Sequence, residues 1–193
     1  MISAMRSLVQ IAALAGIVFL LIVYIYNALV RKSENVRNGW SQIDVQLKRR
    51  HDLIPNLVET VRGYADHERE LFERIAALRS EAIRASTPAE AGVAEAQLSG
   101  ALKTLFAVSE GYPELRANAN FLALQEELAS TENKIAFARQ YYNDSVKEYN
   151  IAVSSFPSSI VAGIAGFGRR DMWTIDLPAE RDAVSVTFPG AGS

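Results

Sequence analysis

Residues 7–30 read SLVQIAALAGIVFLLIVYIYNALV, and no charged side chain interrupts them. At a rise of 1.5 Å per residue, a helix of this length reaches roughly 36 Å, against roughly 30 Å for the hydrocarbon core of a bilayer. The run is longer than the apolar core of a signal peptide, and it ends in Tyr24-Ile25-Tyr26-Asn27 rather than in small residues. The sequence therefore predicts an uncleaved transmembrane helix over residues 7–30, preceded by a short tail over residues 1–6.

The carboxyl end of this run carries the aromatic and basic residues that are typical of a membrane interface. They are Tyr24, Tyr26, Arg31 and Lys32. Basic residues are more numerous after the run than before it, where Arg6 stands. Because basic loops favour the cytoplasm, the excess predicts a single-pass protein of the cell membrane with a short N-terminus outside and the rest in the cytoplasm.

The residues after the anchor predict long helices. Apolar side chains recur at alternating steps of three and four residues from Val36 to Ala82, the spacing of a helix that packs along its length as in a coiled coil. Pro55 lies within this stretch and predicts a kink or a break near His51–Ile54. Because the apolar phase continues across Pro55, a kink is favoured.

Two further helices follow. Thr87-Pro88-Ala89-Glu90 has the pattern of a capping box with proline at the first helical position, and Gly111-Tyr112-Pro113 ends that helix. A third apolar stripe runs from Phe121 to Phe156 and stops at Pro157. The predicted fold is all-α, with a single N-terminal transmembrane helix that continues into an antiparallel bundle of three to four long helices.

The bundle domain is expected over residues 31–168, and a C-terminal tail of undefined role over residues 169–193. Strand-like alternation occurs only in the tail, at Val184, Val186 and Phe188. The formal net charge is −2 with both signs interspersed, which argues against binding of nucleic acid. Cysteine is absent, so no disulfide framework indicates an oxidising compartment.

No arrangement of residues predicts catalysis or a resident metal or cofactor. His51 and His67 both lack the Glu-x-x-His pattern of a di-metal bundle. No serine lies in a nucleophile elbow, and the glycines at 163, 166 and 168 do not form a phosphate loop. Among the charged residues, Arg50 is expected to pair with an acid inside the bundle, and Glu95 is expected on an exposed face.

The apolar segment after Pro157, residues 159–167, is the strongest candidate for an interaction surface. Its large side chains are Ile160, Val161, Ile164 and Phe167. The segment either caps the end of the bundle or contacts another subunit, a partner or a membrane surface. With three long helices it would end far from the bilayer, and with four it would return to the membrane.

Two long segments resemble the core of the LemA family. They are WSQIDVQLKRRHDLIPNLVETVRGYADHE (Trp40–Glu68) and YPELRANANFLALQEELASTENKIAFARQYYNDSVKEYN (Tyr112–Asn150), followed by Phe156-Pro157 and a glycine-rich stretch to Phe167. The resemblance implies a single-span membrane protein with a short outside N-terminus and a helical bundle. It carries over no catalytic residues.

The leading functional hypothesis is a non-enzymatic, membrane-anchored scaffold that organises a membrane-associated assembly. Its expected partners are the lipid bilayer, further copies of the chain and other membrane-associated proteins. The alternative is a ligand-binding or regulatory adaptor module that uses the tip of the bundle or the amide-rich third helix, where Gln125, Asn133, Gln140, Asn143 and Asn150 lie.

Overall fold

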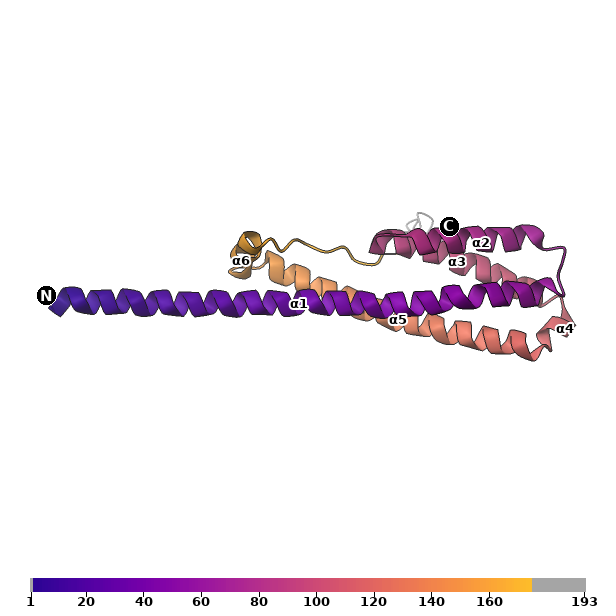
Figure 1. Cartoon of the computed structure of the whole chain (residues 1–193), viewed down its shortest axis with the longest axis horizontal. Coiled ribbons are helices and arrows are strands. Elements are labelled where there is room, and N and C mark those ends of the chain that lie inside the picture. The colour runs from indigo at the N-terminus through magenta and orange to yellow at the C-terminus, as the bar shows by residue number, and fades with distance from the viewer. Residues whose placement is uncertain (1, 175–193) are drawn as a thin grey trace, which may run out of the picture. The chain divides into compact units, whose positions relative to one another are not determined.

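The computed structural model describes residues 2–174, and helices dominate this part of the chain (Figure 1). They are α1 (Ile2–Arg62), α2 (Arg69–Arg84), α3 (Pro88–Ser109), α4 (Pro113–Arg116), α5 (Ala119–Ser154) and α6 (Ser158–Ala165). The predicted all-α class is therefore confirmed over the described range. Val184, Val186 and Phe188, with their strand-like alternation, lie outside the described residues.

The chain divides into two compact units. The first comprises Met1–Arg50 and Leu128–Met172, and the second comprises His51–Glu127 and Trp173–Ser193. The helices α1 and α5 each supply residues to both units.

In the second unit, α1 remains helical through Pro55, so the break that was one of two expected outcomes there does not occur. Proline at position 55 removes the hydrogen bond that the carbonyl of His51, four residues earlier, would accept. The Nε of Arg79 donates to that carbonyl oxygen at 2.7 Å instead. The chain turns at residues 63–68, so the single helix expected from Val36 to Ala82 is in fact two, α1 and α2.

The helices α2 and α3 pack against each other as a hairpin in the second unit (Figure 1). The predicted capping box starts α3: the Glu90 backbone N–H donates to Thr87 Oγ1 at 3.2 Å, and the Thr87 N–H donates to Glu90 Oε2 at 3.3 Å. Apolar side chains from all its helices close the core. The largest fully buried ones are Ile54, Leu57, Val61, Ile75, Leu98, Leu105, Leu115 and Phe121.

Glu95 is buried in this core, so the expectation that it lies on an exposed face is wrong. Its Oε1 lies 2.6 Å from Nε2 of His51, which is also buried. The apolar spacing along α3 does not predict this position. A polar residue can lie on the inner face of a helix when a second polar side chain bonds to it there.

In the first unit, α1 and α5 run antiparallel. Lys32 Nζ lies 2.9 Å from Glu148 Oε2, the rings of Trp40 and Tyr142 are 5.6 Å apart, and Arg50 Nη1 lies 2.9 Å from Glu132 Oε2. The last of these contacts confirms the prediction that Arg50 pairs with an acid. The apolar stripe of α5 ends before Phe156, which is exposed rather than part of the core.

Candidate functional site

The amino-terminal part of α1 is apolar and exposed. Every side chain from Met5 to Tyr24 is exposed, and Arg6 is the one charged residue among them. Within the described residues, α1 is the one helix long and apolar enough to cross a membrane. The predicted transmembrane run is thus a helix whose side chains are exposed along most of its length.

A small apolar cluster lies where the exposed part of α1 ends. Val161 and Ala162 of α6 are buried against Leu29, and Ile25 and Phe167 pack at the edge of the cluster. Gly166 adopts a left-handed conformation with φ of 75° that ends α6, and there the N–H of Phe167 bonds the carbonyl of Ala162. This turn brings the Phe167 ring to 5.8 Å from that of Tyr26.

The cluster divides the four residues predicted as an interaction surface. Val161 and Phe167 face α1 and hold α6 in place, whereas Ile160 and Ile164 are exposed. Sequence spacing could not make this division, because it depends on which face of a short helix meets Leu29. Ile160 and Ile164 are therefore the part of the predicted surface that stays exposed.

The four residues predicted at the membrane interface also differ in their contacts. Tyr26 touches Phe167, and Lys32 pairs with Glu148. The hydrogen bond from Lys32 and its positive charge hold the pKa of Glu148 below its usual range. Tyr24 and Arg31 are exposed on α1.

An extended strap, residues 168–174, follows α6 and was not foreseen from the sequence. The side chain of Asn150 accepts from the N–H of Arg170 at 2.9 Å and donates to its carbonyl at 2.8 Å. Tyr142 Oη donates to the carbonyl of Asp171 at 2.8 Å. Burial, reinforced by the charge of Asp171, raises the pKa of Tyr142, while Arg170 opposes the shift.

The end of the strap belongs to the second unit, where Trp173 is buried beside α3. A Cβ added at Gly92 would overlap the carbonyl oxygen of Thr174 and lie 3.2 Å from Trp173 Nε1. Glycine at this position therefore lets the strap approach the helix backbone. The first residues of the tail predicted over residues 169–193 are thus packed against the protein. The presence of a tryptophan in the tail was the sequence feature that could have indicated this packing.

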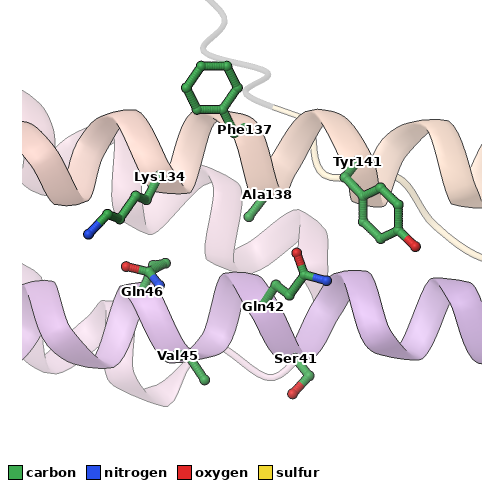
Figure 2. Close-up of a pocket in the computed structure, with 8 residues that line it drawn as sticks. All are labelled: Ser41, Gln42, Val45, Gln46, Lys134, Phe137, Ala138 and Tyr141. Carbon is green, nitrogen blue, oxygen red and sulfur yellow. The ribbon is translucent and has the colours of Figure 1, made fainter.

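A groove of about 550 Å³ runs between α1 and α5 in the first unit (Figure 2). Its lining combines amide, hydroxyl and apolar groups: Ser41, Gln42, Val45, Gln46, Lys134, Phe137, Ala138 and Tyr141. Phe137 and Val45 are exposed, and no described protein group bonds the buried Oε1 of Gln46. The predicted amide-rich helix, α5, forms one wall of this groove, but none of its five amide residues lines it, and the amides of the lining are Gln42 and Gln46 of α1.

No group of three or more metal-ligating side chains gathers anywhere in residues 2–174. His51, one of two histidines in the chain, is engaged with Glu95.

Comparison with known proteins places this architecture in context. The model of the LemA family matches residues 39–188. A magnetosome protein MamQ of Paramagnetospirillum magneticum is 26% identical over 86% of this chain and 71% of its own length. MamQ of Magnetospirillum gryphiswaldense is 27% identical over 75% of this chain and 62% of its own length. The protein LemA of Metamycoplasma hominis is 26% identical over 76% of this chain and 68% of its own length. The relatives that the chain resembles thus include magnetosome proteins as well as a protein named for the LemA family itself.

Proposed function

Because the chain belongs to the LemA family, we propose that it is a non-enzymatic scaffold anchored in the cell membrane by residues 7–30. Its short N-terminus lies outside, and its helical units lie in the cytoplasm. There they organise a membrane-associated assembly that includes further copies of the chain or other membrane-associated proteins.

The exposed apolar part of α1 is the observation that carries this proposal. Soluble monomers rarely expose contiguous apolar patches larger than a few hundred Å². Here a row of large apolar side chains from Met5 to Tyr24 is exposed on one helix. Burial of each in lipid contributes about 1.5–3 kcal/mol, which together makes a bilayer the favoured surroundings.

The continuity of α1 supports a scaffold rather than a loosely tethered module. The helix passes from the apolar run to Arg62 without an interruption. A flexible linker would leave the first unit free to turn relative to its anchor. Helical residues in its place make the anchor and the first unit one structural element.

Alkaline carbonate extraction of membranes tests the anchor. The full chain should remain in the pellet, since only an inserted segment resists this treatment. Release into the supernatant, or a mature N-terminus beyond residue 25, would contradict an uncleaved span.

Thiol labelling tests the orientation, because the chain has no cysteine of its own. Lys103 is exposed on α3, so Lys103→Cys offers a single reactive site that Glu95, being buried, does not. The variant should resist an impermeant reagent in intact spheroplasts and react after lysis. Ready labelling before lysis would reverse the topology and leave the fold unaffected.

Mass measurement in mild detergent tests the scaffold role. Species of defined mass larger than one chain, or reproducible co-purifying membrane proteins, are expected. A chain that is monomeric and brings down no partner would contradict an assembly role.

The groove of the first unit supports a second candidate, an adaptor that binds a ligand or a partner helix. The buried Gln46 Oε1 is an acceptor that a bound donor would satisfy. Phe137→Ala with Lys134→Glu should then abolish partner co-purification. Ile151→Ala, which removes an exposed apolar side chain of α5 outside the groove, is the matched control and should not.

A further inference from the structure

The outer face of α6 is apolar although α6 is already packed on its inner face. Phe156, just before the helix, is 82% exposed, and Ile160 and Ile164 are 56% and 85% exposed. Ile160 and Ile164 are four residues apart, so they lie on one face of the helix. Val161 and Ala162 occupy the opposite, buried side against Leu29.

The level of α6 along α1 indicates what covers this face. Figure 1 shows α6 beside α1, and its contacts there are with Ile25 and Leu29. These two residues belong to the last turns of the uncharged run. The run reaches roughly 36 Å against roughly 30 Å of hydrocarbon, so its final turns lie at the boundary between acyl chains and headgroups.

The surrounding charges fit a lipid surface. Arg31 follows the apolar run on α1, and Arg169 and Arg170 follow α6 on the strap, all with exposed side chains. Apolar side chains beside exposed arginines are the composition of segments that lie in the interface plane and attract anionic lipids.

We propose that α6 is a second membrane contact, which lies in the interfacial layer of the bilayer that α1 crosses and inserts Phe156, Ile160 and Ile164 among the lipids. This inference rests on the proposed anchoring of α1. Contacts with Leu29 on one side and with lipid on the other would fix the height of the first unit at the membrane surface. The span and α6 together then form a two-point attachment.

Fluorescence quenching in lipid vesicles tests this proposal on the full chain. Single variants Ile17→Cys, Ile164→Cys and Phe137→Cys each carry an environment-sensitive dye, since no native cysteine competes. All three side chains are exposed, so labelling should not disturb the fold. The proteins are reconstituted into vesicles of phosphatidylcholine and phosphatidylglycerol with nitroxide lipids that quench either near the headgroup or near the end of the acyl chain.

The dye at position 164 should be quenched several-fold more strongly by the shallow nitroxide than by the deep one. The dye at position 17 should show the reverse order, and the dye at position 137 should be quenched by neither. Quenching at 17 without quenching at 164 would overturn the contact of α6 and spare the anchor. No quenching at 17 would overturn the anchor itself.

A blue-shifted dye at position 164 that neither nitroxide quenches would show that another protein surface covers α6, which also overturns the proposal. A second series of vesicles without phosphatidylglycerol separates the insertion of apolar side chains from the attraction of the arginines to anionic lipids. If the arginines contribute, shallow quenching at 164 should fall in neutral vesicles while quenching at 17 stays unchanged.

Discussion

From Met5 to Tyr24 every side chain of α1 is exposed, whereas from Leu29 to Val61 the same helix buries side chains at helical spacing. The first stretch is apolar all round, and the second is apolar on one stripe with charged residues elsewhere. One continuous helix therefore carries two patterns, an apolar surface on all sides in its first stretch and an apolar stripe on one side in its second. In the first stretch hydrophobicity selects the surroundings, and in the second its periodicity selects the protein neighbours.

A carboxylate placed in each stretch should give the sharpest contrast. Ile43 has no exposed surface, so Ile43→Asp loses a core side chain, at about 2–5 kcal/mol, and buries an unpaired charge as well. Against a typical stability of roughly 5–15 kcal/mol, the first unit should lose its cooperative melt. Circular dichroism of the full chain in detergent measures this.

Ile17→Asp is the matched control, because Ile17 is exposed and the new carboxylate would replace no buried side chain. It should leave the melting temperature unchanged and weaken membrane insertion by about 2.5–3.5 kcal/mol. Equal effects of the two variants on the melt would abolish the distinction between the two stretches of α1.

Glycine-to-alanine changes on α3 extend the comparison of buried and open positions to the second unit. Gly92→Ala places a Cβ against Thr174 and Trp173, so we expect a loss of about 1–3 kcal/mol and release of Trp173. Gly100→Ala meets nothing within 4 Å and should stabilise the helix by about 0.5–1 kcal/mol. Thermal melts measure the stability of both variants, and tryptophan emission reports release of Trp173. A red shift of the emission in Gly100→Ala would contradict the prediction for that variant.

The smallest expected effect concerns Tyr142, which faces the buried stretch of α1 through Trp40. Folding raises its pKa above the usual 10.0, so the folded chain keeps this proton longer than the unfolded chain. The free energy of unfolding is therefore undiminished below about pH 10 and falls as the pH rises further.

Tyr142→Phe should remove the fall in the free energy of unfolding above about pH 10. At neutral pH it should lower that free energy by about 0.5–1.5 kcal/mol, because the hydrogen bond to Asp171 is lost. Its neighbour Tyr141 is exposed, so Tyr141→Phe should change neither quantity. Denaturant titrations at neutral and alkaline pH measure both variants. If the free energy of unfolding fell equally above pH 10 in the wild type and in Tyr142→Phe, another group would be responsible for the pH dependence.

The helical class, the capping box at Thr87 and the pairing of Arg50 could be predicted because each depends on local chemistry or on a charge that must be compensated. The turn at residues 63–68 could not, since the apolar spacing continues across it and Pro55 gave the stronger local signal for a kink or a break. That signal was overridden by a distant residue: Arg79 bonds the carbonyl that the proline leaves without its helical partner. Sequence spacing does not reveal such compensation.

For the candidate site, composition singled out the segment after Pro157 and the residues around Tyr26, and the structure brings Phe167 of that segment into contact with Tyr26. It did not reveal which face of α6 is buried, nor the two hydrogen bonds between the Asn150 side chain and the backbone of Arg170. A side-chain amide that imitates a peptide group has no sequence pattern of its own. Only the folded arrangement of α5 and the strap distinguishes it from an exposed asparagine.

The packing of α6 on Leu29 also determines which side of the apolar part of α1 faces α6. Successive residues of an α-helix turn by about 100°, so Ala12 and Gly16 lie about 100° and about 140° around the axis from Leu29. Small residues four apart are where a second helix in lipid can approach closely. Such a helix would meet α1 on a side turned away from α6, and both sides could be occupied at once. Insertion of one residue between Gly16 and Ile25 would rotate the small-residue face by about 100°, to about 0° and about 40° from Leu29, and bring the two occupants into conflict.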